Sequence, residues 1–209
     1  MTVTVATNLA DALAALRATP EARLLQGGTD TMVEINFNHF KPEHIVALRK
    51  VQELRNFSIQ EEKGLIFIGS GVPYQTLEND PFLTLLPALA QASRTVGSPQ
   101  IRAAGSLGGN LGTCSPAGDG LPVLSALDAT VHLQSVDASR DVLIHDFMVG
   151  VKKNARKPDE IITGVTVPIL RGFQGYSKVG VRNAMVISVA SACLAVETSR
   201  SQIRLALGA

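Results

Sequence analysis

The chain has 209 residues and a formal net charge of +1, with 45% hydrophobic and 18% charged residues. This composition is typical of a globular protein with one large domain or two small ones. Aromatic residues make up only 4% and there is no long basic run. We therefore do not expect the stacking platforms or the positive surface with which proteins bind nucleic acids.

The cysteines, the histidines and the N-terminus exclude further classes. Cys114 and Cys193 form no Cys-x-x-Cys pair and the histidines are scattered, so we expect no metal or iron–sulfur site within this chain. The N-terminus lacks a basic segment followed by an apolar run, and no apolar stretch is long enough to span a membrane. We expect a reduced, soluble, cytoplasmic protein.

The first 55 residues have the pattern of a small α/β unit. Short apolar runs predict strands at Val3–Val5 (an edge strand), Leu24–Leu25 and Ile45–Leu48. Asn8 is a typical N-cap, and Leu9, Leu13 and Leu16 follow at helical spacing, so a helix should join the first two strands and end before Pro20.

Residues 56 to 170 have a different pattern. Apolar or alternating runs predict strands at Leu65–Ile68, Val131–Ser135 and Ile161–Val167. The stretch Phe82–Thr95 predicts a helix that Pro87 breaks or restarts, and Pro122 is placed at the first position of another helix. Between these helices, Gly105–Gly112 is expected to be a glycine-rich loop.

The last segment begins near Gly172. Gln174–Val179 and Ile203–Leu207 predict strands, whereas Ala184–Val196 fits either a strand or a helix. A strand that stops without a partner leaves unpaired edge groups. We therefore expect this last domain to be incomplete, or to be completed by another chain.

Two glycine clusters are the most informative feature of the sequence. Gly105–Gly112 reads G-x-x-G-G-x-x-G, and Gly27–Gly28 forms a second cluster. Glycine permits close approach of a ligand, and clustered backbone N–H groups bind anions. Because no lysine follows the glycines as in a P-loop, backbone amides would have to hold a phosphate, at roughly 1.5–3 kcal/mol for each bond. The alternative is a glycine-rich turn with no ligand.

The polar residues near these glycines leave alternatives open. Asp119 either accepts from a ribose or ribityl hydroxyl or caps the following helix, and the Thr29–Asp30 pair either caps a turn or lets Thr29 hydrogen-bond the cofactor's phosphate. Cys114 has no neighbouring His or Lys that would lower its pKa, so we favour a small buried residue over a reactive thiol.

No set of residues stands out as a catalytic acid, base or nucleophile. His132 alternates with apolar residues and is expected on the surface, and the basic residues from Lys152 to Lys157 are expected to form a solvated loop. A chain with so few catalytic candidates is typical of a protein that holds a cofactor, which then supplies the chemistry.

Short motifs in a fixed order carry a resemblance to a known family. They are Leu24–Asp30, Ile68–Val72, Ile101–Leu111, Ser115–Asp119, Leu127–Ala129, and Lys178 with Arg182. Together they cover nearly the whole chain. In this order they resemble the FAD-binding medium subunit of molybdenum hydroxylases, the flavoprotein family of xanthine dehydrogenase and carbon monoxide dehydrogenase.

The resemblance implies an α+β fold. Residues 1–170 would form a two-part FAD-binding domain of the vanillyl-alcohol-oxidase (PCMH) type, with subdomains at about 1–55 and 56–170. Residues 171–209 would start a C-terminal α+β domain, which normally runs many tens of residues further in the family. We therefore expect that domain to be truncated here.

The resemblance also implies the residues that contact FAD. The two glycine clusters would surround the diphosphate, Asp119 would contact the polyol, and Val96, Ile162 and Lys178 would lie near the flavin ring. The complete expected set is Leu24, Leu25, Gln26, Gly27, Gly28, Thr29, Asp30, Thr31, Val96, Ser106, Leu107, Gly108, Gly109, Asn110, Thr113, Asp119, Ile162 and Lys178. No metal ligand and no catalytic acid or base is expected.

The function implied is that of an electron-transfer subunit. Substrate would be oxidised at a molybdopterin cofactor on a large partner subunit, and [2Fe–2S] clusters on a small partner would pass electrons to FAD on this chain. The acceptor would be NAD⁺, oxygen or a quinone, and the assembly a dimer of heterotrimers. Two alternatives are a self-contained flavin-dependent oxidase and a non-catalytic assembly subunit whose glycine clusters bind nothing.

Overall fold

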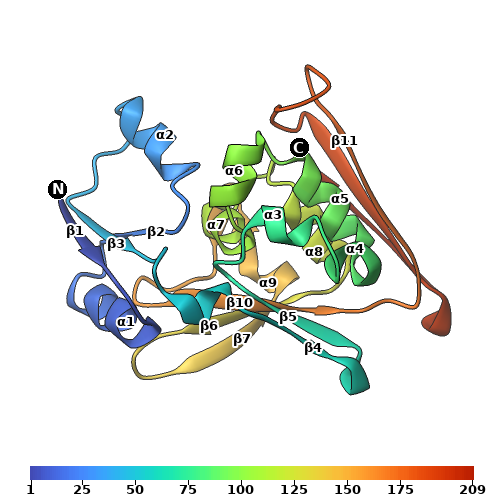
Figure 1. Ribbon diagram of the computed structural model, residues 1–209, viewed down its shortest axis with the longest axis horizontal. Coiled ribbons are helices and arrows are strands. Elements are labelled where there is room, and N and C mark those ends of the chain that lie inside the picture. The colour runs from blue at the N-terminus through green and yellow to red at the C-terminus, as the bar shows by residue number, and fades with distance from the viewer.

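The computed structural model describes residues 1–209, and its first unit is a small parallel sheet with one helix (Figure 1). The strands, in the order β1–β3–β2, are β1 (Thr2–Val5), β3 (His44–Ala47) and β2 (Arg23–Leu25). Helix α1 (Leu9–Ala18) joins β1 to β2, and the side chain of Asn8 accepts a hydrogen bond from the N–H of Asp11. The predicted edge strand, N-cap and helix are confirmed.

The glycine turn after β2 leads into a short helix rather than another strand. Helix α2 (Thr31–Asn36) begins directly after the turn, and the 3₁₀ helix η1 (Gln52–Arg55) follows β3 and ends the unit. Leu13 and Leu16 of α1 pack with Val46 of β3 and Leu54 of η1 in a buried core. This core also includes Ile161 of the second unit, although it is distinct from the main core of that unit.

The second unit is built on a five-stranded antiparallel sheet. Its strands, in the order β4–β5–β10–β6–β7, are β4 (Phe57–Gln60), β5 (Leu65–Gly69), β10 (Ile161–Pro168), β6 (Thr130–Gln134) and β7 (Ser139–Leu143). Strand β10 lies at the centre, where Val165 pairs with Ile68 on one side and with Val131 on the other. All three side chains are buried, so the predicted strands form the core of this unit.

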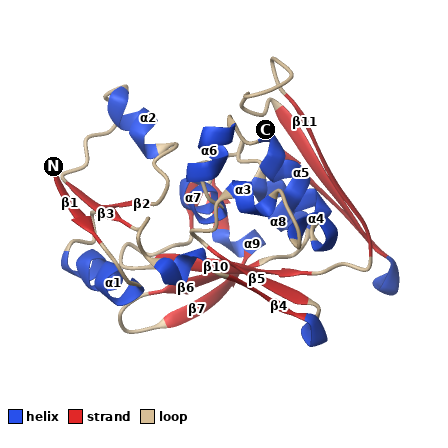
Figure 2. Ribbon diagram, in the orientation of Figure 1, coloured by secondary structure: helices blue, strands red, loops and turns tan.

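Short helices gather on one side of this sheet (Figure 2). They are α3 (Tyr74–Leu77), α4 (Phe82–Leu85), α5 (Pro87–Thr95), α6 (Pro99–Ala104), α7 (Leu107–Thr113), α8 (Gly120–Ala126) and α9 (Ile144–Phe147). Pro87 occupies the first turn of α5, as predicted for a helix that restarts there. Leu107, Leu111 and Leu124 point into the main core.

A third sheet packs against the helices. Its antiparallel strands, in the order β11–β12–β13, are β11 (Gly172–Val179), β12 (Ala190–Glu197) and β13 (Gln202–Gly208). Cys193 and Ala195 of β12 belong to the main core, whereas Ile203, Leu205 and Leu207 of β13 are exposed. The small hairpin of β8 (Met148–Gly150) and β9 (Lys153–Asn154), the 3₁₀ helix η2 (Glu61–Lys63) and η3 (Thr198–Arg200) complete the chain.

Two predictions about local structure are wrong. Most of the expected glycine-rich loop is helix α7, which begins after Ser106, whose side chain accepts a hydrogen bond from the N–H of Gly109. Helix α8 begins at Gly120, so Pro122 is its third residue rather than its first. In both cases the preceding residues join the helix because tertiary packing outweighs the low helix propensity of glycine.

Candidate functional site

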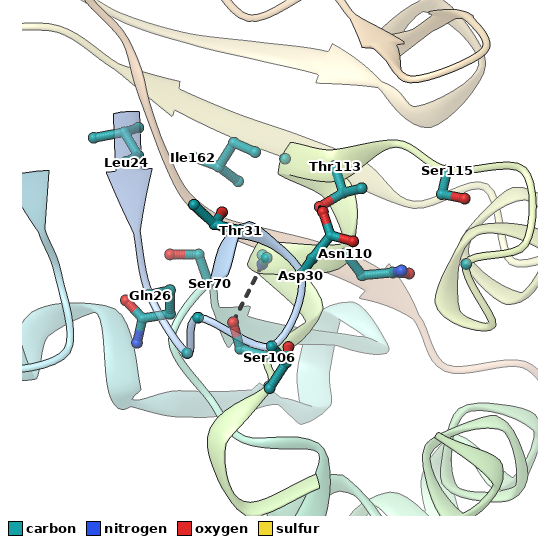
Figure 3. Close-up of a pocket in the computed structure, with 18 of the residues that line it drawn as sticks. Leu24, Gln26, Asp30, Thr31, Ser70, Ser106, Asn110, Thr113, Ser115 and Ile162 are labelled. Carbon is teal, nitrogen blue, oxygen red and sulfur yellow. Dashed lines mark hydrogen bonds between the residues drawn. The ribbon is translucent and has the colours of Figure 1, made fainter. Parts of the chain in front are cut away.

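A cavity of about 770 Å³ lies where the first unit meets α6 and α7 of the second. The segment from β2 to α2 supplies one wall, and the turn after β5, the residues before α7 and the start of β10 supply others. In Figure 3, Gln26, Asp30 and Thr31 lie along the first-unit segment, with Ser70 and Ser106 of the second unit beside it and Asp30 next to Asn110 and Thr113. Three glycine-bearing turns that are distant in sequence therefore share one space.

Direct backbone contact between the two predicted glycine clusters shapes this cavity. A Cβ atom at Gly27 would overlap the carbonyl oxygen of Ala104 and lie 2.6 Å from its carbon. A Cβ atom at Gly108 would lie 2.5 Å from the carbonyl oxygen of Ser70. Because no side chain fits at these contacts, glycine is required for the first cluster to lie against the segment before α7, and for α7 to lie against the turn after β5.

The two clusters differ in their free backbone donors. The N–H groups of the five residues Gln26–Asp30 donate to no acceptor within the chain; we call these five groups the amide cluster. In the second cluster, Gly108 donates to the carbonyl of Ser70 at 3.0 Å and Gly109 to Oγ of Ser106 at 3.2 Å. The N–H groups of Gly108 and Gly109 are therefore bonded within the chain, and the predicted contact of these two residues with a cofactor stays a prediction.

Three buried polar atoms on the wall of the cavity also lack partners. They are Oε1 of Gln26, the hydroxyl of Tyr74 and Oδ1 of Asn110. Burial, together with the nearby Asp119 charge, raises the pKa of Tyr74, so this group remains a neutral hydroxyl. Buried polar atoms in folded proteins nearly always have hydrogen-bond partners, so these three atoms are candidate contacts for a polar ligand.

Asp119 is held by two side chains from β11. Its Oδ1 accepts from the hydroxyl of Tyr176 at 2.7 Å, and its Oδ2 lies 2.8 Å from Nζ of Lys178. Asp119 occupies the N-cap position of α8, but its side chain makes no capping hydrogen bond there. Lys178 also donates to the carbonyl of Thr95 at 3.0 Å. The lysine charge is therefore largely compensated by Asp119.

Most residues of the predicted set line the cavity. These are Leu24, Gln26, Gly27, Gly28, Thr29, Asp30, Thr31, Val96, Ser106, Gly108, Gly109, Asn110, Thr113, Asp119 and Ile162. Three do not line it: Leu25 lies half-buried in β2, Leu107 is buried in the core, and Lys178 is bonded to Asp119. Their roles toward a cofactor stay predictions.

Cavity residues that the sequence did not single out as ligands come from four places. Ser70 follows β5, Tyr74 begins α3, Arg156 precedes β10, and Met185 lies between β11 and β12. Ser70 lies in the Ile68–Val72 motif, so it could have been found there. The prediction of a solvated loop at 152–157 is wrong for Arg156, which is partly buried and lines the cavity.

The remaining candidates from the sequence are structural. Cys114 is buried as predicted, and burial raises the pKa of its thiol. His132 points away from the main core, but it is not a free surface histidine, because Asp141 and Thr166 contact its two ring nitrogens at 2.6 and 2.7 Å. No three His, Cys, Asp or Glu side chains are grouped so that they could hold a metal ion.

Residues 1–170 match the protein-family model described as the FAD binding domain in molybdopterin dehydrogenase. The chain belongs to this family. Its membership was predicted from the ordered motifs and is confirmed. The predicted ligands from Leu24 to Ile162 all lie within the residues that match this FAD domain.

Individual relatives of this FAD domain match over most of the chain. The nicotinate dehydrogenase FAD-subunit of Eubacterium barkeri is 38% identical over 180 residues, which are 83% of this chain and 60% of that protein. The xanthine dehydrogenase FAD-binding subunit of Escherichia coli O157:H7 is 31% identical over 210 residues, covering 97% of this chain and 72% of that protein.

A solved structure extends the likeness to the fold. A chain of the reconstituted CO dehydrogenase from Oligotropha carboxidovorans is similar to this chain with a TM-score of 0.91 at 26% identity, covering 100% of this chain and 74% of that one. The predicted α+β fold is confirmed. The chain spans 60% to 74% of the length of these three relatives. None of its helices has the length and hydrophobicity needed to cross a membrane.

The cavity fits FAD, the cofactor of this family. Its amide cluster can donate to a diphosphate, because consecutive unbonded N–H groups form an anion-binding concavity. The unpartnered oxygens of Gln26, Tyr74 and Asn110 can bond the hydroxyls and the ring edge of a dinucleotide. Val96 and Ile162 supply apolar surface.

Proposed function

We propose that the chain is the FAD-binding electron-transfer subunit of a molybdenum hydroxylase complex. The observation that carries the proposal is the amide cluster, which opens into a cavity within a family FAD domain. No histidine, cysteine or lysine lines that cavity. The carboxylates that line it include Asp119, which is already bonded to Tyr176 and Lys178. Such a cavity is better suited to hold a redox cofactor than to transform an organic substrate with its own side chains.

Each part of the cavity has a role in this proposal. The amide cluster holds the diphosphate, and Asp119, fixed by Tyr176 and Lys178, accepts a hydrogen bond from the polyol. Tyr74 and Asn110 use their unpartnered oxygens to orient the cofactor. Bound FAD supplies the electron-transfer chemistry. The residues of this chain bind it, keep its polar groups bonded and exclude water.

Partners complete the proposed electron path. The relatives include proteins called FAD-subunit and medium chain, which supports a complex with a large subunit that carries a molybdopterin cofactor and a small subunit that carries [2Fe–2S] clusters. Substrate is oxidised on the large subunit, and NAD⁺, oxygen or a quinone accepts the electrons from FAD. We propose a dimer of heterotrimers in the cytoplasm.

The three sheets suggest the domain organisation. We propose a PCMH-type FAD domain at residues 1–170, with subdomains at about 1–55 and 56–170, followed by the first part of a C-terminal domain at 171–209. The exposed side chains of Ile203, Leu205 and Leu207 on β13 support this, because a row of large apolar residues on one face of a strand is typical of a face that packs against further structure.

Flavin binding tests the proposal. The purified 209-residue chain is mixed with FAD, freed of unbound ligand by gel filtration, and examined by absorbance and circular dichroism. We expect about one FAD per chain with the shifted spectrum of bound flavin. A natively folded chain that retains no FAD would contradict the proposal and favour the assembly-subunit alternative. Oxidation of a small alcohol by the isolated holoprotein would favour the oxidase alternative.

A further inference from the structure

Arg156 is a partly buried cation on the cavity wall whose hydrogen-bonding capacity is only partly used. Its Nη1 donates to the carbonyls of Lys157, Pro158 and Glu160 at 2.9, 3.2 and 2.7 Å. Its Nε and Nη2 donate to no group of the chain. A guanidinium group has five N–H donors in a planar fork. At least three donors of this group are therefore available to a ligand.

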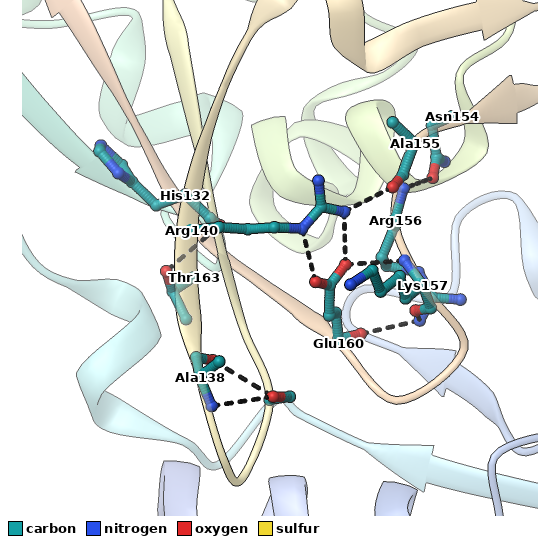
Figure 4. Close-up of polar contacts among 10 residues, drawn as sticks. His132, Ala138, Arg140, Asn154, Ala155, Arg156, Lys157, Glu160 and Thr163 are labelled. Carbon is teal, nitrogen blue, oxygen red and sulfur yellow. Dashed lines mark hydrogen bonds and ion pairs between the residues drawn. The ribbon is translucent and has the colours of Figure 1, made fainter.

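No carboxylate of the chain bonds to this guanidinium. The obvious partner, Glu160, accepts from Nε and Nη2 of Arg140 at 2.7 and 2.8 Å and from the N–H of Lys157 at 2.7 Å (Figure 4). Burial lowers the pKa of Arg156, whereas the charges of Glu160 and Asp159 raise it without a hydrogen bond to the guanidinium, and an arginine remains charged at neutral pH. Because neither carboxylate bonds to the guanidinium, its free N–H donors can still bond an anion that is not part of the chain.

Arg23 increases the positive charge at the same end of the cavity. It begins β2 and also lines the cavity, and its charge is close enough to help lower the pKa of Arg156. Its guanidinium lies over the ring of Phe40 at 5.3 Å and donates to Glu34 at 3.2 Å. Nζ of Lys152 lies 3.5 Å from the same Glu34 carboxylate. One carboxylate is therefore shared by two cations and compensates only part of their charge.

The cationic end lies close to the amide cluster. Arg23 is three residues before Gln26, so along strand β2 about 10 Å separates it from the first free amide. Arg156 is held against α7 by its neighbour Asn154, whose amide donates to the carbonyls of Leu111 and Gly112 at 3.3 and 3.0 Å. The residues of the amide cluster and both arginines therefore line one cavity from different segments of the chain.

We propose that Arg156, assisted by Arg23, binds a phosphate group of the dinucleotide and so supplies the cation that neither glycine cluster contains. The inference rests on the proposed function, because it assigns a further contact to the same cofactor. A planar guanidinium fork matches phosphate oxygens, and such charge-assisted hydrogen bonds are the strong ones. Arg156 is thus a ligand-binding residue that lies outside both glycine clusters.

Affinity measurements with two flavins test this inference. The dissociation constants of FAD and of riboflavin, which has no phosphate, are measured by flavin fluorescence for the full chain at low and high salt. We expect Arg156→Gln to weaken FAD binding about tenfold or more, to leave riboflavin binding unchanged, and to make the FAD affinity less dependent on salt. Arg156→Lys, which keeps the charge but not the fork, is expected to lie in between.

Two further variants serve as a control for the loss of charge and as a second test. Arg171 is exposed and its side chain makes no hydrogen bond or ion pair, so Arg171→Gln removes the same charge and is expected to bind FAD as the wild type does. If Arg156→Gln does not fold, Arg23→Gln carries the test, with an expected severalfold loss for FAD and none for riboflavin.

Three results would overturn the inference while leaving the proposed function intact. They are unchanged FAD affinity in folded Arg156→Gln, an equal loss for FAD and riboflavin, or a loss for FAD with an unchanged salt dependence, which would indicate contact with the adenine ring. Absence of FAD binding by the wild-type chain would overturn the proposed function, and this inference with it.

Discussion

Nζ of Lys178 lies 2.8 Å from Oδ2 of Asp119, and the two side chains are only 6% and 8% exposed. This buried pair joins β11 to the start of α8 across 59 positions of sequence. It fixes the carboxylate at the cavity and at the same time compensates the lysine charge. The pair therefore ties the third sheet to the proposed cofactor site.

Asp119→Asn tests the structural value of this pair. The change leaves Lys178 as a buried charge without a counterion, so we expect the free energy of unfolding without FAD to fall by about 3–5 kcal/mol in urea titrations. Asp137→Asn is the matched control, since Asp137 pairs with Arg17 at 2.9 Å with both side chains exposed. That change should cost less than about 1 kcal/mol. Equal losses in both variants would show that burial of the pair is unimportant.

Two glycines of α7 test whether this segment is a helix packed on the turn after β5. Nothing lies within 4 Å of a Cβ built at Gly112, so Gly112→Ala should stabilise the apo chain by roughly 0.5–1 kcal/mol through its higher helix propensity. Gly108→Ala should destabilise it by several times that amount, because its Cβ would meet Ser70. Thermal unfolding of both variants measures the difference. Destabilisation by Gly112→Ala that matches that of Gly108→Ala would favour a loop.

Glu160 gives the fold a predictable response to acid. The hydrogen bond from Arg140 lowers the pKa of Glu160 below its ordinary value. A carboxyl group with a lowered pKa in the folded state stabilises the protein above its unfolded-state pKa and loses that contribution as the pH falls through the folded-state pKa. Glu160→Gln should therefore cost roughly 1–3 kcal/mol at neutral pH and less at low pH.

Urea titrations at a series of pH values from neutral downward measure this dependence. Glu62→Gln is the control, because Glu62 is exposed and makes no hydrogen bond or ion pair. A cost of Glu160→Gln that stays the same at low pH would contradict the assigned role of the carboxylate.

The two cysteines should be inert in the native state. Cys114 and Cys193 are 3% and 0% exposed. Burial raises the pKa of both thiols, that of Cys193 to about 11, so neither carries the reactive thiolate at neutral pH. We expect no modification by an aromatic disulfide reagent at pH 7 until denaturant is added, when both should react. Rapid labelling of the folded chain would revive the reactive-thiol alternative for Cys114.

Local sequence signals predicted the elements that depend on local interactions. Asn8 and the leucines of α1 identified that helix, because an N-cap and a 3.6-residue period act within a few positions. The glycine clusters at Gly27 and Gly108 identified the wall of the cavity, since only glycine fits at backbone contacts of this kind.

Features that depend on long-range packing were not predictable from the sequence. Helix α7 contains three glycines, which disfavour a helix by propensity alone. Arg156 reaches the cavity because Arg140 and Asn154 position its loop, and these contacts join separate segments of the chain. Asp119 was recognised as a candidate, but its partners Tyr176 and Lys178 lie on a strand whose position the sequence does not specify.

Hydrogen–deuterium exchange with and without FAD tests most directly whether the amide cluster of Gln26–Asp30 holds the diphosphate. These N–H groups have no acceptor in the chain, so they should exchange rapidly in the apo protein and become strongly protected when FAD is added. The N–H groups of Gly108 and Gly109 are bonded internally and should change less. Unchanged exchange across Gln26–Asp30 in a chain saturated with FAD would show that this cluster does not hold the diphosphate.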